Sequence, residues 1–396
     1  MIVPQRPTHR RASSRRLLSH LLAGAALLAT AFLPLAPASA AAPRQLEPFW
    51  DAPAVLASPM PRLPDEVVGS RAGRQAGPPR AIEVANLAAE SATAPLSFGG
   101  QRSNLPWASG STGDETFGTW RGRAQDIHVI FSGRESWDSI RRVPGFSTTR
   151  RYASRARVSL GLAMLTNDQR GNFAGCAAGI NDEHIRAVAR GLVANGAGNS
   201  VVRLGWEMNG KGFPWSVGAF ADLTPLYRDC FIRLATIIRA EAPDVLIEWT
   251  PRRGTDPRLR LEALYPGDEY VDIIGLLYYD WWPASPTEEA WARNMVQRDK
   301  HGGPRGIGTW LEFAQDRGKP FAVAEWGIGK HLTMDPFDNP VFIRKMFDFF
   351  RDNAADLAYE SYFNNLTHRL FTGEGKLLSA SANSAATYLQ LYRPTP

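Results

Sequence analysis

Cysteine and lysine are both scarce in this chain of 396 residues. Cys176 and Cys230 are the only cysteines, and lysine occurs six times. Two cysteines exclude a framework of several disulfides and allow one bond at most. Whether that bond forms depends on the distance between the two residues in the fold, which the sequence leaves open.

The chain also lacks a strong net charge outside residues 1–40. The formal net charge is +6, but residues 1–40 contain five arginines and no acidic residue. Removing these five arginines leaves a charge of +1 on the rest of the chain. Because nucleic-acid binding needs a basic surface, we expect no nucleic-acid partner.

The chain lacks a second long hydrophobic run. The first one, residues 21–33, follows the arginines and precedes Ala38-Ser39-Ala40. This order predicts a signal peptide over residues 1–40, cleaved after Ala40, with an uncleaved anchor as the alternative. Arg15-Arg16 and the leucines after them resemble a twin-arginine export signal. We therefore expect a secreted or periplasmic protein that leaves the membrane after cleavage.

Several catalytic motifs are absent as well. There is no G-x-S-x-G sequence, which argues against an esterase of that type. Lys211 is followed by Gly212 instead of Ser or Thr, so this glycine-containing segment is not a phosphate-binding loop. The histidines lack the helical spacing of a zinc site. We expect neither a metal nor a cofactor.

Proline is concentrated in residues 41–95, which contain nine prolines and many alanines. Because proline fixes φ and removes a hydrogen-bond donor, this segment predicts a mostly disordered spacer. The folded domain is then expected over residues 96–394.

Within that domain, apolar runs alternate with amphipathic stretches. Such runs suit strands buried on both faces of a parallel sheet, and their alternation with helices predicts repeated βα units. The expected strands lie at 126–131, 158–165, 200–209, 245–252, 271–280, 320–327 and 357–364. The expected helices lie at 182–195, 223–240, 290–297, 307–316 and 341–352.

Seven strands are visible in this pattern, and an eighth must precede Asp126. It is placed either in residues 105–110 or in residues 117–120. Eight βα units in about 295 residues are typical of a (β/α)8 TIM barrel, which is the predicted fold. A doubly wound open sheet is the competing fold.

Acidic and aromatic residues are combined at the ends of the predicted strands. Glu207 follows Trp206, and Glu325 precedes Trp326. In a TIM barrel the functional groups gather where strands end and loops begin. We therefore expect Glu207 and Glu325 to meet at the mouth of the barrel.

Strand alternation predicts which neighbours share a face with these glutamates. Arg203 should lie on the face of Glu207, and Phe321 and Val323 should lie on the face of Glu325. A carboxylate at the end of an apolar strand needs a partner or a function. Glycoside hydrolysis uses two such carboxyl groups, and aromatic rings stack on sugar faces. In the alternative interpretation the glutamates form structural salt bridges and the tryptophans belong to the core.

Four segments resemble glycoside hydrolase family 26. Val201–Gly210 (VVRLGWEMNG), followed by Phe213-Pro214-Trp215, is similar to the segment of this family that carries the acid/base. Ala324-Glu325-Trp326-Gly327 resembles its nucleophile segment, and Phe117–Arg123 (FGTWRGR) resembles its N-terminal region.

The resemblance implies a retaining (β/α)8 enzyme with the acid/base Glu207 at the end of strand 4 and the nucleophile Glu325 at the end of strand 7. Their carboxyl groups would lie about 5–5.5 Å apart. The negative charge of Glu325 would raise the pKa of Glu207, and Tyr279 would donate a hydrogen bond to Glu325. The residues expected to bind the sugar are Trp206, Asn209, Trp215, Tyr279, Trp282, Trp326 and Tyr362.

Three positions depart from the family's mannanases. Trp206 stands where they usually have His, Gly212 where they often have Trp, and Leu277 where they have Asp. The leading hypothesis is a secreted, monomeric endo-β-glycoside hydrolase acting on a polysaccharide, with β-1,4-mannan first. The alternatives are hydrolysis of a mixed-linkage β-glucan or an exopolysaccharide, and a barrel that binds carbohydrate without cleaving it.

Overall fold

The structure is a computed structural model of the whole chain. The residues it describes are 98, 100–112, 116–254, 256–281, 283–329, 338–365, 368–371 and 379–394. The predicted signal peptide over residues 1–40 and the predicted spacer over residues 41–95 lie outside them. Trp282 also lies outside the described residues.

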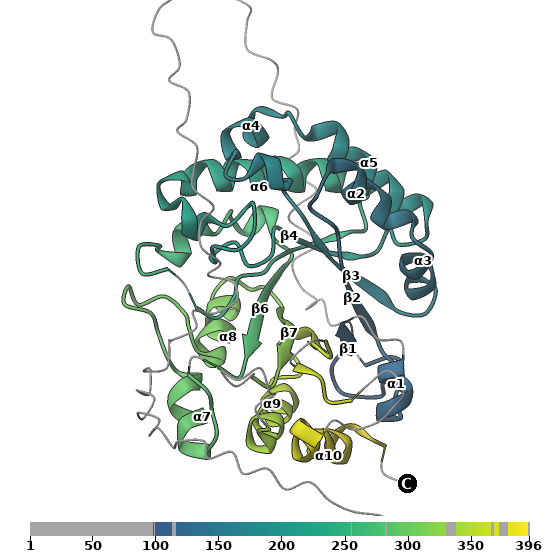
Figure 1. The fold of residues 1–396 in the computed structure, drawn as a ribbon, viewed down its shortest axis with the longest axis vertical. Coiled ribbons are helices and arrows are strands. Elements are labelled where there is room, and N and C mark those ends of the chain that lie inside the picture. Colours follow the sequence, from purple (N-terminus) through teal and green to yellow (C-terminus); the bar gives the residue numbers. More distant parts are fainter. Residues whose placement is uncertain are drawn as a thin grey trace, which may run out of the picture. The chain divides into compact units, whose positions relative to one another are not determined.

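Eight parallel strands form a closed barrel in chain order, with the last strand beside the first (Figure 1). The strands are β1 (Ser109–Thr112), β2 (Ile127–Phe131), β3 (Arg157–Leu162), β4 (Val201–Leu204), β5 (Leu246–Trp249), β6 (Ile273–Tyr279), β7 (Phe321–Gly327) and β8 (Leu357–Tyr362). The predicted TIM barrel is confirmed, and the competing open sheet is wrong because β1 pairs with both β2 and β8.

The first strand is the element that the sequence placed least well. β1 overlaps only the end of the candidate 105–110, and the other candidate, 117–120, lies in helix α1 (Thr116–Arg121). The sequence of β1 is Ser-Gly-Ser-Thr, so it contains no apolar run. Its small side chains are fully buried where the two ends of the barrel meet.

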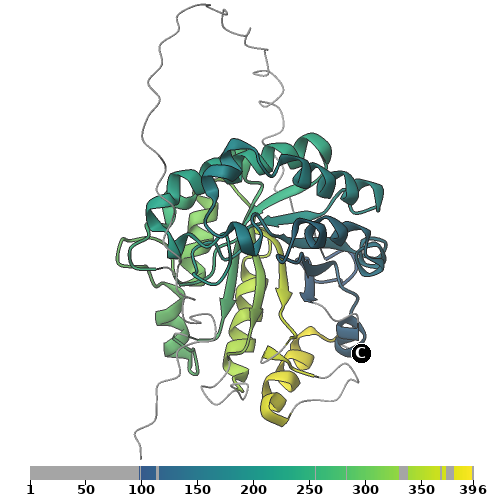
Figure 2. The ribbon, with the colours of Figure 1, turned by 45° about the horizontal axis from the view of Figure 1, so that its top comes forward.

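The helices lie outside the strands (Figures 1 and 2). Five match the expected ranges within a few residues: α5 (Asp182–Ala194), α6 (Thr224–Glu241), α7 (Glu288–Met295), α8 (Ile307–Gln315) and α9 (Pro340–Asp352). The sequence did not predict α1, α2 (Trp137–Arg142), α3 (Ser147–Ala153), α4 (Phe173–Ala178) and α10 (Ala382–Tyr392). None of the described helices is both long and apolar enough to cross a membrane.

A disulfide links α4 to α6. Cys176 and Cys230 are bonded, with their Cα atoms 5.2 Å apart and 54 residues between them in sequence. The structure thus answers a question that the sequence left open.

The barrel interior has an apolar lower layer with a polar layer above it. Ile127, Val201 and Ile273, near the starts of their strands, belong to a small apolar cluster. Above it, Glu248 accepts hydrogen bonds from Tyr359 Oη at 2.6 Å and Thr250 Oγ1 at 2.7 Å. The polar side chains of the middle of the barrel are therefore hydrogen-bonded to one another beneath the upper rim.

Candidate active site

A β-bulge in β7 directs Glu325 into the barrel. On β6, Gly275 and Leu277 are two residues apart, but their partners on β7, Ala322 and Glu325, are three apart. An extra residue of this kind re-aims a side chain and is common beside active sites.

Because of this bulge, the alternation of inward and outward side chains predicted for β7 is wrong. Phe321 and Val323 pack in the main hydrophobic core with the outer helices, whereas Glu325 reaches Arg203 inside the barrel. The three residues therefore do not share one face.

Both carboxylate oxygens of Glu325 are held by donors from other strands. Arg203 Nη1, from β4, donates to Oε1 at 2.6 Å, and Tyr279 Oη, from the end of β6, donates to Oε2 at 2.8 Å. Glu325 is 3% exposed and Arg203 is fully buried. The hydrogen bond expected from Tyr279 is thus present, and the two donors fix the orientation of the carboxylate.

Arg203 is not fully satisfied by this contact. Its guanidinium carbon lies 4.9 Å from the ring centroid of Phe131, and its Nε and Nη2 have no hydrogen-bond partner among the described residues. A buried guanidinium with two unpaired N–H groups is costly. Its position is explained by the carboxylate that it holds rather than by packing.

Glu207 lies on a tight turn after β4. The strand ends at Leu204, and Gly205 and Glu207 have φ values of 59° and 55°. A Cβ atom on Gly205 would lie 2.2 Å from Met164 Sδ, so only glycine fits there. The Glu207 N–H donates to the carbonyl of Thr250 at 2.8 Å, which ties the turn to the end of β5. The predicted strand continuation from Arg203 to Glu207 is therefore wrong, because the chain leaves the sheet between them.

The surroundings of Glu207 raise its pKa to about 7. Burial is the largest cause, the negative charge of Glu325 adds to it, and the positive charges of Arg252 and Arg203 oppose it. The predicted influence of Glu325 is confirmed, with burial the larger contribution. A carboxyl group with this pKa is largely protonated in mildly acidic water and can donate a proton near neutrality.

Aromatic side chains continue the site from Tyr279. The Tyr279 ring stacks on His368 with centroids 4.4 Å apart, and the half-buried Trp281 lies edge-on to Tyr279 at 6.1 Å and to His368 at 5.6 Å. His368 Nδ1 lies 2.6 Å from the carbonyl oxygen of Ile328. Trp281 extends this aromatic group, whereas the sequence prediction named its neighbour Trp282 as the sugar-binding residue. The position of Trp281 directly after Tyr279 and Asp280 was the available signal.

The sequence of this chain and its fold both match known glycoside hydrolases. Residues 185–301 match the model of glycosyl hydrolase family 26. This segment includes Glu207, Arg252 and Tyr279. Within this segment the chain resembles glycosyl hydrolase family 26. No curated protein sequence matches this chain significantly.

Solved structures resemble this chain in fold. An endo-β-1,4-mannanase double mutant of Cellulomonas fimi is 14% identical, with a TM-score of 0.52 over 75% of this chain and 73% of its own. The β-mannanase BoMan26A of Bacteroides ovatus is 16% identical, with a TM-score of 0.52 over 72% and 88%. GH26C of Muricauda sp. MAR_2010_75 is 15% identical, with a TM-score of 0.53 over 74% and 91%. At these identities the likeness concerns the fold.

Two tryptophans that were predicted to bind sugar form an aromatic cluster below the rim. Trp206 is 4% exposed and packs against Phe131, Phe213 and Trp215 at centroid distances of 4.7–5.3 Å. Trp215 has no exposed surface, and its Nε1 donates to the Trp206 carbonyl at 2.8 Å. Trp215 therefore supports the turn that carries Glu207 and does not line a subsite.

Three further predictions need the same correction. Trp326 and Tyr362 are fully buried, and they meet edge-to-face at 4.8 Å. Trp326 Nε1 donates to Glu360, and Tyr362 Oη donates to the His368 carbonyl. Asn209 is also fully buried and hydrogen-bonds to the backbone after β5. With no exposed surface, these side chains shape the walls of the site from behind.

The described residues contain no group of three or more His, Cys, Asp or Glu side chains arranged to hold a metal ion. The chemistry available among them is that of two carboxyl groups in different environments. One, Glu325, is paired with a cation and a phenol, and the other, the half-buried Glu207, has a raised pKa.

Proposed function

We propose that the protein is a retaining β-glycoside hydrolase that cleaves a polysaccharide internally, with Glu325 as nucleophile and Glu207 as acid/base. The observation that carries the proposal is the environment of Glu325. Its oxygens accept from Arg203 and Tyr279 while the neighbouring Glu207 has a pKa of about 7. This combination sets a carboxylate held by a cation beside a carboxyl group that can donate a proton near neutrality, as double displacement requires.

In the first step a Glu325 oxygen attacks the anomeric carbon, and the bond from that carbon to the leaving oxygen breaks. The proton of Glu207 goes to the leaving oxygen, which departs as a hydroxyl group. In the second step Glu207 takes a proton from water, the water oxygen attacks the anomeric carbon, and the ester bond to Glu325 breaks. The proton taken up restores Glu207 to its starting form.

β-1,4-Mannan is the leading substrate. The family 26 match and the names of the Cellulomonas fimi and Bacteroides ovatus mannanases support it. A mixed-linkage β-glucan or an exopolysaccharide is the second candidate, because Trp206, Gly212 and Leu277 differ from the usual mannanase residues. The pairing of Glu325 argues against the non-catalytic alternative. Export to the periplasm or the medium rests on residues 1–40, and a monomeric state stays a prediction.

The test combines a substrate panel with chemical trapping. The enzyme is incubated with mannan, glucomannan, lichenan and xylan. Chromatography follows the sizes of the products, and proton NMR shows the anomeric form of the first product. Cleavage to mixed oligosaccharides with β-anomers is expected. A 2-deoxy-2-fluoro glycosyl fluoride should label the peptide containing Glu325, and Glu325→Ala should stay unlabelled. An α-anomeric first product, or a label on another peptide, would contradict the mechanism.

A further inference from the structure

Arg252 is one of two basic side chains whose charge acts on Glu207, and unlike Arg203 it is not paired with Glu325. It follows β5, and the side chain of Asn209 holds its backbone on both sides. The Arg252 N–H donates to Asn209 Oδ1 at 2.9 Å, and Asn209 Nδ2 donates to the Arg252 carbonyl at 2.8 Å. The buried Asn209 is thus explained as the residue that fixes Arg252 beside the acid/base.

The guanidinium of Arg252 is only partly satisfied by the protein. The side chain is half-buried, its Nε is buried without a hydrogen-bond partner, and no carboxylate among the described residues forms an ion pair with it. Two other cations on these loops have a carboxylate partner. Lys211 and Arg258 both contact Asp256, at 3.1 Å and 3.0 Å.

In the first step, cleavage of a neutral sugar gains nothing from such a cation beside the catalytic acid. Arg252 opposes the rise in the pKa of Glu207, which works against the protonated form that the first step needs. A half-buried guanidinium has lost part of its hydration. A carboxylate compensates for this loss best, because it accepts two parallel hydrogen bonds from the guanidinium. Glu325 does not serve as this partner, because its oxygens are already held by Arg203 and Tyr279.

We infer that Arg252 forms a subsite for an anionic group, so that the preferred polymer carries a carboxylate on a sugar next to the cleaved bond. This inference rests on the proposed function and narrows its substrate class to acidic polysaccharides. The competing explanation is that Arg252 serves only the ionised form of Glu207 in the second step. That explanation predicts no preference between neutral and acidic polymers.

Binding to matched polymers separates the two explanations. Mannan and mixed-linkage β-glucan are each compared with the same polymer partly oxidised to the carboxylate at C6. The protein is the Glu325→Ala variant, and affinity is measured by calorimetry at two salt concentrations. We expect about tenfold tighter binding of the oxidised member of at least one pair, as a charge-assisted contact would give.

The same measurement is then made with Arg252→Gln added. The preference should disappear with Arg252→Gln and persist with the control Arg258→Gln, whose arginine lies on the same loop but pairs with Asp256. Equal affinity within both polymer pairs, or a preference that survives Arg252→Gln, would overturn the inference. Neither result bears on the trapping of Glu325, so the proposed function stands or falls separately.

Discussion

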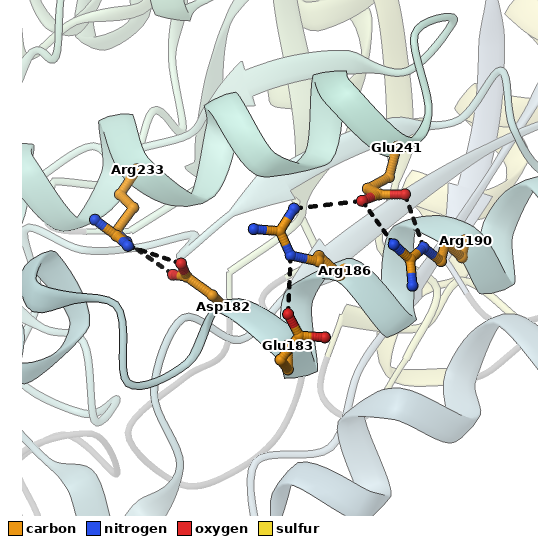
Figure 3. A network of polar contacts seen from close by, with 6 residues as sticks. All are labelled: Asp182, Glu183, Arg186, Arg190, Arg233 and Glu241. Atoms are coloured by element: carbon orange, nitrogen blue, oxygen red, sulfur yellow. Dashed lines mark hydrogen bonds and ion pairs between the residues drawn. The ribbon is translucent and has the colours of Figure 1, made fainter.

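Arginine–carboxylate contacts occur in two very different settings in this molecule. Inside the barrel, one buried arginine meets one buried glutamate, Arg203 with Glu325. On the outside, α5 and α6 are joined by six charged side chains (Figure 3). These are Asp182, Glu183, Arg186, Arg190, Arg233 and Glu241.

The outer network is the better satisfied of the two. Arg233 makes two hydrogen bonds to Asp182, at 2.8 Å and 2.7 Å, and Arg190 makes two to Glu241, at 2.8 Å and 3.0 Å. However, the Arg190 side chain is 62% exposed, so water and salt screen these contacts. Good geometry at the surface therefore contributes little to stability.

The inner pair has the opposite properties. Arg203 has two unpaired N–H groups, and both partners are removed from water. Replacing a buried ion pair by apolar residues is often neutral or stabilising, so such a pair is weak evidence for a structural role. The buried contact is thus better explained by the proposed role of Glu325 than by stability, whereas the exposed network joins two helices at the surface.

The strongest test of the difference between the two regions is to remove one carboxylate from each. Glu325→Ala should lower kcat/KM by about 10⁴-fold or more, because the covalent step loses its nucleophile. Glu241→Ala on the surface should leave kcat/KM unchanged. Steady-state rates on the best polysaccharide of the panel provide the measurement, and similar losses in both variants would contradict the assignment.

The arginines can be compared in the same way through stability. Arg203→Met should lower the free energy of unfolding by about 3–5 kcal/mol, because it leaves Glu325 as an uncompensated buried charge. The double variant Arg203→Met/Glu325→Leu should regain most of this loss. Denaturant unfolding measures both, and a double variant as unstable as the single one would show that Arg203 matters for packing alone.

A covalent bond, rather than the ion pairs, should dominate the stability of the α4–α6 region. Loss of the bond between Cys176 and Cys230 releases a loop of 54 residues in the unfolded chain. The Cys176→Ala/Cys230→Ala variant should lose about 2–4 kcal/mol of unfolding free energy. An unchanged denaturation midpoint would contradict this expectation.

The pH dependence reports on the inner region. Because Glu207 must be protonated to donate and its pKa is raised to about 7, kcat/KM should fall as pH rises through about 7, approaching tenfold per pH unit above it. The charge of Arg252 lowers the pKa of Glu207. The Arg252→Gln variant should therefore shift the alkaline side of the kcat/KM profile to higher pH. A limb that stays in place in this variant would exclude direct electrostatic contact between the two groups.

The smallest effect is expected from the outer network. Arg190→Gln should change Tm by no more than about 2 °C and leave the pH profile untouched. The same scan in high salt should reduce even this difference. A larger shift would mean that the exposed pairs act as a cooperative unit.

The sequence predicted the parts of the fold that depend on apolar patterning. The long apolar runs predicted the positions of β6 and β7. The acidic residues at the ends of these runs drew attention to Tyr279 and Glu325. The strand β1 could not be found in this way, since Ser109–Thr112 has no apolar pattern and is defined only by pairing with distant strands.

The errors in the candidate site have two physical sources. The β7 bulge and the left-handed turn at Glu207 are local departures from regular strand geometry, and the residue types at these positions do not predict them. The outward position of Trp326, in contrast, was predictable. Adjacent strand residues normally face opposite sides, so an inward Glu325 sends its neighbour toward the helices.

The junction between β1 and β8 has a consequence for how the protein is made. Ser109 pairs with Glu360, its hydroxyl donates to the carboxylate of Glu360, and Arg121 Nη1 donates to that hydroxyl at 2.6 Å. The ring therefore cannot close until the ribosome has added the last of its eight segments. A nascent chain that stops short of β8 exposes two unpaired sheet edges, and such edges invite aggregation. The presence of β8, rather than of any earlier segment, is therefore what allows the sheet to close.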